Sequence, residues 1–251
     1  MEKNRKKLLF LIAIAFWILV WQAAVSAANR NLLIPVPTPV STGKALVSLA
    51  KDPGFYRAVF SSVLRIAAGF AGAFAAGTVL AVLDAKFTLF RIFTSPLLSL
   101  IRAIPVASFT ILVFLWVERA KIPSVISFFT VLPIIWATIS SGLRDADSGL
   151  VEMARVFGMP GGAILKEILL PGIRPFFTAA VVNGIGFAWK SGVAAEVITR
   201  TGSSVGNLLW EGKTSVDYDE VFAVTIVIVI LSAALETLAK RLLRDRAKSR
   251  A

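Results

Sequence analysis

Apolar residues run in long stretches along this chain, and shorter polar segments separate them. A helix that crosses the hydrocarbon core of a bilayer needs roughly 20 mostly apolar residues. Six stretches reach this length, at residues 8–28, 58–83, 96–117, 122–143, 172–198 and 221–243. The pattern therefore predicts an all-α polytopic membrane protein whose six spans pack as one bundle, with residues 1–251 forming a single domain.

The first stretch has two interpretations. Basic residues precede it and Val-Ser-Ala stands at positions 25–27, an outline that a cleaved signal peptide shares. Its apolar run is longer than the roughly 7–15 residues of a signal-peptide core. We therefore favour a first transmembrane helix that is retained.

Composition narrows the chemistry open to such a bundle. Hydrophobic residues make up 57% of the 251 positions and charged residues only 17%, a balance unlike that of a soluble domain. Cysteine and histidine are absent, which excludes disulfides, thiolate or imidazole metal ligands, and nucleophiles activated by histidine. We expect no catalytic residue, no metal site and no cofactor.

The net charge is +12, and the basic residues are distributed unevenly. If both termini and the loop at 144–171 lie in the cytoplasm, that side holds 16 of the 27 lysines and arginines, and the opposite side holds eight. The positive-inside rule favours this orientation. Because the charge follows the tails and loops, we expect the lipid bilayer, and no nucleic acid, as a partner.

A polar island at residues 144–171 separates the fourth and fifth stretches. Residues 152–157 predict a short helix, Gly158 and the Pro-Gly-Gly run at 160–162 end it, and residues 163–170 predict a second short helix. Pro171 and Pro175 are expected to start the fifth span directly after this helix–turn–helix knob. The knob is longer than a minimal connection, so it either docks a cytoplasmic partner or packs beneath its own bundle.

The island resembles the EAA loop of ATP-binding cassette (ABC) importer permeases. In that loop a glutamate is followed by two residues that are often alanine, then by a glycine, and after nine further positions by Ile-x-Leu-Pro. The matching residues are Glu152, Ala154, Gly158, Ile168, Leu170 and Pro171. Met153 departs from the commoner alanine, but methionine is also a good helix former.

This resemblance implies the type I importer (MetI-like) fold, with the island as a cytoplasmic coupling helix. It implies two ATPase subunits docked on the islands, with Glu152 at the contact, and ATP bound by those subunits rather than by this chain. It also implies a second permease copy, expected as a homodimer, and an extracytoplasmic solute-binding protein. Transport would proceed by alternating access across a bacterial cell membrane.

Three further segments resemble one branch of these permeases. They lie at residues 95–105, 186–196 and 218–223, and the branch imports sulfonates, taurine, nitrate and some vitamin precursors. The resemblance covers roughly residues 55–243. It implies a small anion or organic solute as the substrate.

Charged residues within membrane spans are costly and mark candidates for a translocation pathway. The candidates are Lys190, Arg65, Glu196 and Arg102. Arg65 and Arg102 have a second interpretation, in which their side chains reach the outer and inner surfaces respectively. Glu196 and Arg200 are four residues apart, a spacing that allows them to pair on one helix face.

Other patterns bear on packing. Small residues recur at three- and four-residue spacings in the second span and predict close helix packing, at Gly69, Gly72, Ala73 and Gly77. Residues 29–57 contain three closely spaced prolines and predict an extended segment. An apolar patch at 208–210 is expected to enter the membrane edge or to pack beneath a partner.

Two other functional classes remain open at this stage. An ion-coupled transporter or channel would use Arg65, Lys190 and Glu196, but the chain has no visible inverted repeat. A membrane-embedded enzyme would need a carboxylate pair or a metal cluster, and none is apparent. The run Gly212-Lys213-Thr214 ends like a phosphate-binding loop, yet Asn207 stands where that motif needs a glycine.

Overall fold

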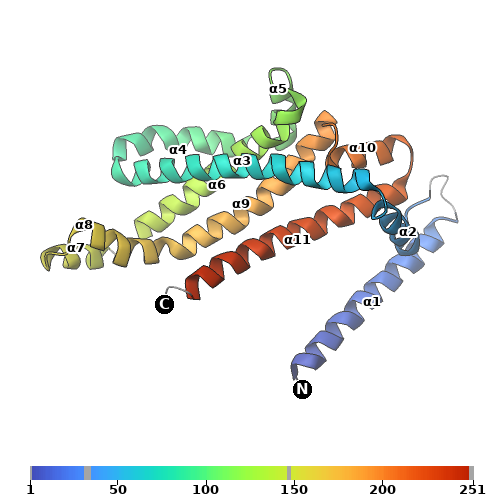
Figure 1. Cartoon of the computed structure of the whole chain (residues 1–251), viewed down its shortest axis with the longest axis horizontal. Coiled ribbons are helices and arrows are strands. Elements are labelled where there is room, and N and C mark those ends of the chain that lie inside the picture. Colours follow the sequence, from blue (N-terminus) through green and yellow to red (C-terminus); the bar gives the residue numbers. More distant parts are fainter. Residues whose placement is uncertain (1, 31–34, 146–147, 249–251) are drawn as a thin grey trace.

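The computed structural model describes residues 2–30, 35–145 and 148–248, and the regular structure in these ranges is helical (Figure 1). In chain order the helices are α1 (Glu2–Ala28), α2 (Pro39–Leu49), α3 (Pro53–Lys86), α4 (Thr88–Ala103), α5 (Val106–Phe114), η1 (Arg119–Lys121), α6 (Ile122–Asp145), α7 (Ser148–Val156), α8 (Gly161–Ile164), the π-helical η2 (Leu165–Leu169), α9 (Leu170–Thr199), α10 (Val205–Thr214) and α11 (Tyr218–Lys248). The prediction of an all-α membrane bundle is confirmed.

Among the described residues, four segments are long and apolar enough to cross a membrane, namely Pro53–Lys86, Arg119–Asp145, Gly161–Thr199 and Tyr218–Leu243. They coincide with the second, fourth, fifth and sixth predicted spans, so those predictions are confirmed. α1 covers the first predicted span, and the apolar part described within it, Ile12–Ala28, is shorter.

The third predicted span is not a single helix. α4 and α5 are bent relative to each other by 96°, and Ile104 between them has an extended backbone (φ −72°, ψ 126°). Pro105 follows directly. Proline disfavours the helical conformation in the residue before it and has no N–H to continue the helix. The prediction of one helix over 96–117 is therefore wrong, although the composition is apolar throughout.

The main core lies where α3, α6 and α9 pack against one another (Figure 1). Ala73 of α3 is fully buried in it. A Cβ atom built on Gly69 would lie 2.2 Å from the carbonyl oxygen of Ser124, and one on Gly77 would lie 2.9 Å from the Cβ of Ile135. α3 and α6 thus approach as closely as small residues permit, as the spacing predicts.

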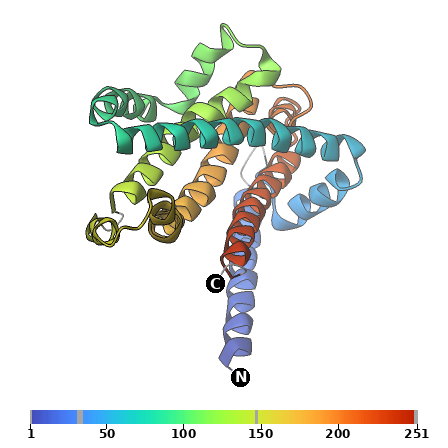
Figure 2. The same ribbon diagram turned by 60° about the vertical axis from the view of Figure 1, so that its left-hand side comes forward.

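α1 makes few contacts with the rest of the chain. It touches α2, and the ring of Trp21 lies 6.1 Å from that of Phe222 in α11. Figures 1 and 2 show α1 projecting away from the bundle towards the N-terminus. Most of its described side chains are exposed, so most of its apolar surface has no partner within the described chain.

The segment before α2 is extended only briefly. The Thr38 hydroxyl accepts a hydrogen bond of 3.1 Å from the Ser41 N–H, and Pro39 occupies the first turn, where its missing N–H costs nothing. The prediction of an extended segment over 29–57 is therefore wrong beyond residue 38, and residues 31–34 lie outside the described ranges.

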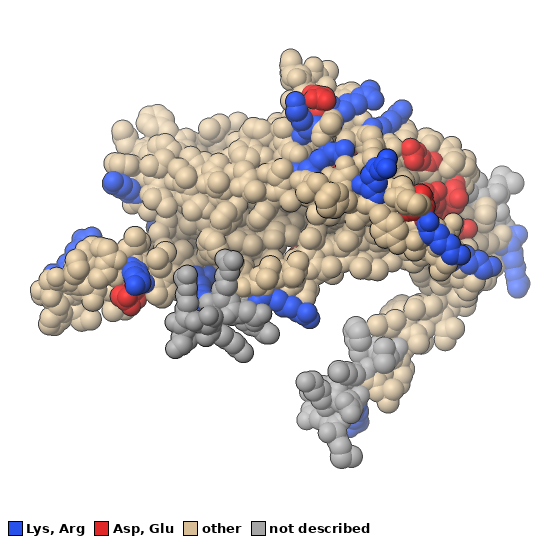
Figure 3. All heavy atoms as spheres, in the orientation of Figure 1, with Lys and Arg blue, Asp and Glu red and all other residues tan. Residues whose placement is uncertain are grey.

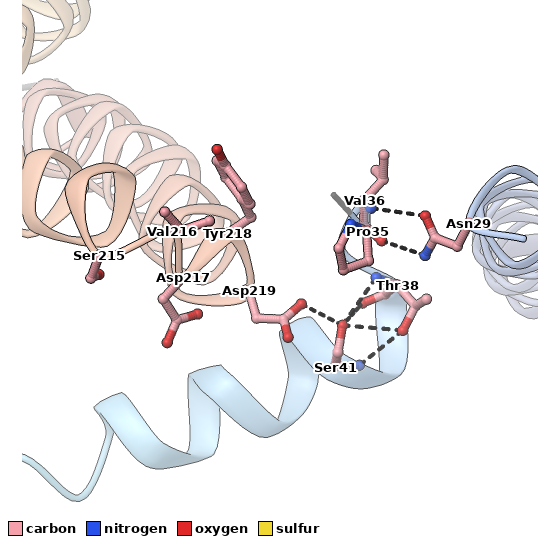
Figure 4. A pocket seen from close by; sticks show the side chains of 10 residues that line it. All are labelled: Asn29, Pro35, Val36, Thr38, Ser41, Ser215, Val216, Asp217, Tyr218 and Asp219. Carbon is pink, nitrogen blue, oxygen red and sulfur yellow. Dashed lines mark hydrogen bonds between the residues drawn. The ribbon is translucent and has the colours of Figure 1, made fainter. Parts of the chain in front are cut away.

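A pocket of about 600 Å³ lies where this segment meets the connection between α10 and α11 (Figure 4). The Ser41 hydroxyl donates a hydrogen bond of 2.6 Å to the Asp219 carboxylate, and this bond ties α2 to the start of α11. The pocket is at the same end of the bundle as α10, which is hereafter called the α10 end. The opposite end carries α7 and α8 and is called the α7 end.

Candidate functional site

The knob at the α7 end begins with α7, which ends in a tight turn at Gly158. Gly158 has a φ of +75°, a conformation that favours glycine. Its N–H donates to the Arg155 carbonyl and the Met159 N–H donates to the Ala154 carbonyl, each at 2.9 Å. This pair of bonds is a Schellman motif, in which glycine at the turn lets the last helical carbonyls find donors.

The turn leaves two apolar side chains in the open. Val156 is 85% exposed and Phe157 is 82% exposed, the highest values among the large hydrophobic residues described in this structure. Glu152 and Met153 are exposed beside them, while Ala154 is buried and lets the turn close over it. Exposed apolar patches commonly mark interaction sites. The turn at Gly158 is therefore a candidate site for docking a partner.

The second half of the island does not form a separate helix. α8, η2 and α9 run on as one continuous helical segment, Gly161–Thr199. Pro171 lies in the first turn of α9, at the start of the fifth span as predicted, but the helix continues through it without a break. Proline lacks the N–H that an α-helix needs and its ring crowds the carbonyl four residues earlier; the π-helical turn just before it, in which the Leu170 N–H donates to the Leu165 carbonyl, widens the helix enough to continue.

The island therefore splits into an exposed turn and a helical stem. Glu152, Ala154 and Gly158 belong to α7 and its turn. Ile168 is half-buried and Leu170 exposed in the stem, together with Pro171. Figures 1 and 2 show this knob projecting beyond α6 and α9, so it does not pack beneath its own bundle.

Charged side chains gather towards the ends of the molecule, and a largely uncharged surface lies between them (Figure 3). α4 also exposes large apolar side chains, among them Leu89, Phe93 and Leu100. This distribution is the one expected for a protein whose middle lies in lipid.

Glu196 is fully buried near the C-terminal end of α9. Its Oε2 atom accepts a hydrogen bond of 2.8 Å from the Ser62 hydroxyl and one of 3.2 Å from the Gly206 N–H. Its Oε1 atom lies 3.8 Å from a terminal guanidinium nitrogen of Arg65. The structure thus brings two of the predicted pathway residues together, at a place where α3, α9 and α10 meet.

Arg200 takes no part in that cluster. It ends α9 in the left-handed conformation (φ 50°), and its guanidinium lies 4.0 Å from the centre of the Trp210 ring. Pairing of Glu196 with Arg200, which their spacing allowed, is therefore wrong. Leu208 and Leu209 are half-buried and pack against α2, α3 and α11 of this chain.

Lys190 and Arg102 lie elsewhere, and both are exposed. Lys190 shares one exposed face of α9 with Asn183 and Phe187. Arg102 is in the last turn of α4, about 21 Å along the helix from its first residue.

Residues 70–248 match the family described as "Binding-protein-dependent transport system inner membrane component". The chain belongs to this family. It is a permease subunit of a binding-protein-dependent ABC importer, and the resemblance read from residues 152–171 is confirmed at the level of the family.

The permease is similar to named importer permeases over much of its length. It is 25% identical over 233 residues to the nitrate import permease protein NrtB of Synechocystis sp., which covers 90% of this chain and 84% of that protein. It is 32% identical over 145 residues to the putative aliphatic sulfonates transport permease protein SsuC of Escherichia coli K12, which covers 57% of this chain and 52% of that protein.

Among solved structures, the permease is similar to a chain of a bacterial alginate ABC transporter in complex with an alginate pentasaccharide-bound periplasmic protein. The TM-score is 0.65 at 15% sequence identity, and the match covers 98% of this chain and 97% of that chain. A likeness at this identity shows a shared fold.

The permease also carries candidates that the sequence did not single out. Asp84 is buried at the end of α3 and accepts a hydrogen bond from the Trp136 indole of α6. The Glu236 carboxylate of α11 lies against Gly186 of α9. Asp84 falls one residue past the predicted second span, so nothing in the hydropathy pattern indicated that it is buried. The exposure of Phe157 did have a signal in the sequence, since Phe157 is the one aromatic residue of the island at 144–171.

Proposed function

We propose that this permease forms half of a translocation pathway that works by alternating access, and that an ATPase subunit drives it by docking on the α7 knob. The exposed pair Val156 and Phe157 carries this proposal. Both side chains project from a rigid glycine-closed turn, and an aromatic anchor of this kind contributes strongly when a partner buries it. The surrounding Glu152 and Arg155 supply a polar rim.

The orientation follows from the knob and from the charge. The α7 end lies in the cytoplasm, where ATP is available, and both termini lie on that side, in agreement with the excess of basic residues. The α10 end then faces outwards, towards a solute-binding protein. The permease itself holds no ATP, because the nucleotide belongs to the two docked ATPase subunits.

A second copy of the permease completes the pathway. Lys190 and Asn183 lie on the exposed face of α9, and a charged side chain facing lipid at this depth is costly. An identical copy packed across that face gives both residues an aqueous lining. The largely uncovered α1 supplies further apolar surface for contact between the copies.

The substrate class is a small anion. The similarity to permeases named for nitrate and aliphatic sulfonates supports it, as does a positively charged Lys190 on the pathway face. The choice among anions rests with the solute-binding protein, which is a separate chain.

The test of the docking proposal is to measure binding of the ATPase subunit to the permease in lipid nanodiscs. Burying a phenylalanine side chain contributes about 1.5–3 kcal/mol, and Phe157 has 82% of its surface to bury. Phe157→Ala is therefore expected to weaken the affinity about 8- to 70-fold. Phe93→Ala is the matched control, because Phe93 is 72% exposed on α4, away from the knob.

Comparison of the two variants distinguishes loss of docking at the knob from a general effect of removing an exposed phenylalanine. An unchanged affinity in Phe157→Ala, or an equal loss in Phe93→Ala, would show that the knob does not dock the ATPase. Absence of any ATPase from the complex purified through this chain, together with uptake driven by an ion gradient, would favour the ion-coupled transporter instead.

A further inference from the structure

The buried carboxylate of Glu196 lies at the N-terminal end of α10, where backbone N–H groups have no partner within the helix. The Gly206 N–H donates to Glu196 at 3.2 Å. The Val205 N–H donates to the Ser62 hydroxyl at 2.9 Å, and the Asn207 N–H donates to the Ser204 hydroxyl at 3.0 Å. Three successive donors of α10 are thus satisfied by side chains, and Glu196 places a negative charge where the helix dipole favours one.

The backbone of α10 is in direct contact with α9 at this point. A Cβ atom built on Gly206 would lie 2.4 Å from the Glu196 Cβ and 2.6 Å from the Val197 nitrogen. The glycine is therefore required for α10 to reach the carboxylate. Since Ser62 also donates to Glu196, one carboxylate joins α3, α9 and α10.

The two carboxylate oxygens of Glu196 differ in their hydrogen bonds. The Oε2 atom of Glu196 receives both hydrogen bonds, whereas Oε1 is buried and receives none. Arg65, which is 22% exposed, lies 3.8 Å from Oε1 and donates instead to the Ser203 carbonyl at 3.1 Å. The same guanidinium nitrogen makes both contacts, so Arg65 can donate to Glu196 Oε1 once the Ser203 carbonyl moves away.

These contacts permit two arrangements of the same groups, of which the structure shows one. In the observed one, α10 occupies the carboxylate and Arg65 holds the loop before α10. In the other, α10 has left, and Arg65 replaces the Gly206 N–H as the partner of Glu196. Exchange of one partner for another leaves the buried charge compensated in both, which is the requirement for a switch between two discrete states.

We propose that Glu196 is the positioning residue of a gate at the α10 end: its carboxylate fixes α10 against α3 and α9, and α10 leaves it when that end of the pathway opens. This inference rests on the proposed alternating access. Glu196 is a positioning residue because it acts on the pathway through α10.

The test uses the absence of cysteine from the chain, which makes a single introduced thiol the only site on the permease that a maleimide labels, and the label on the permease band is measured. Val205→Cys places it at the first residue of α10, at a position that is fully buried. The complete transporter is reconstituted in liposomes, and the rate of labelling by a membrane-impermeant maleimide is measured with and without ATP and vanadate.

Gly206→Ala, in the Val205→Cys background, keeps every group of the cluster and displaces α10 sterically. It is expected to raise the nucleotide-free labelling rate about tenfold or more. Glu196→Gln, which preserves size and removes the charge, is expected to raise it about threefold and to increase ATP hydrolysis in the absence of binding protein. Gly202→Ala is the matched control, because its Cβ would meet no atom within 4 Å, and its labelling rate should not change.

Unchanged labelling in both Gly206→Ala and Glu196→Gln would overturn the gate, as would an equal rise in Gly202→Ala. A rise in labelling with unchanged hydrolysis in Glu196→Gln would also overturn it, because Glu196 would then hold α10 for stability alone. Failure of the docking proposal gives a different result: the three variants would still differ in nucleotide-free labelling, but ATP and vanadate would have no effect.

Discussion

Gly69→Ala is expected to destabilise the bundle where α3 crosses α6. The added Cβ would lie 2.2 Å from the Ser124 carbonyl oxygen, 2.9 Å from its carbonyl carbon and 3.0 Å from its Cα. A close C···O contact is about 3.3 Å, so the two helices must separate by about 1.1 Å. All three contacts are with backbone atoms, and no side-chain rotation relieves them.

The magnitude follows from two costs and one gain. Overpacking of this kind costs about 1–3 kcal/mol. Separation also strains the 2.7 Å hydrogen bond from the Ser124 hydroxyl to the Arg65 carbonyl, which contributes about 0.5–1.5 kcal/mol. Alanine is favoured over glycine inside a helix by about 0.5–1 kcal/mol. The net expectation is a loss of about 1–3 kcal/mol in the free energy of unfolding.

Gly72→Ala makes the same change one turn away and serves as the comparison. Its Cβ would meet only the Phe128 ring, at 3.3 Å, and a ring can move by a few tenths of an ångström. Unfolding of both variants in mixed detergent micelles measures the difference. Equal stability of Gly69→Ala and Gly72→Ala would refute the close approach of α3 to α6.

Two further predictions concern charged groups. Lys190→Gln is expected to lower the rate of anion uptake while leaving binding of the ATPase unchanged, because Lys190 is exposed on α9 far from the knob; normal uptake in proteoliposomes would remove Lys190 from the pathway. Trp136→Phe leaves the buried Asp84 without its indole donor and is expected to cost about 1–3 kcal/mol in the free energy of unfolding. Asp84→Asn in that background removes the buried charge and should recover part of the lost stability. No recovery would show that an unpaired Asp84 carboxylate is not the cause of the loss.

Hydropathy predicted the straight spans well because burial in lipid demands length and apolar composition from each helix. It missed the break between α4 and α5, since the composition there does not change. Proline alone would not have located the break either: Pro96 and Pro133 lie inside α4 and α6, where neighbouring helices accommodate the lost hydrogen bond.

At the candidate site, too, features set by neighbouring residues were predictable from the sequence, whereas contacts between residues far apart in the sequence were not. The motif at 152–158 predicted the position of the turn, because the residues next to a helix end, above all a glycine, determine where the helix stops. The partners of Glu196 were not predictable in this way. The spacing to Arg200 suggested a local pair, whereas Arg65 and Ser62 come from α3, more than 130 residues earlier, and only the packing of α3 against α9 brings them together.

The continuous segment Gly161–Thr199 spans 39 residues, or about 58 Å of helix. It begins beside the exposed turn at Gly158 and ends three residues after Glu196. A rod of that length is a lever arm: a tilt of about 5° at the knob end carries its far end through about 5 Å if the rod stays straight. If an ATPase docks on the knob as proposed, this one helical segment connects the docking turn to the Glu196 cluster at the α10 end.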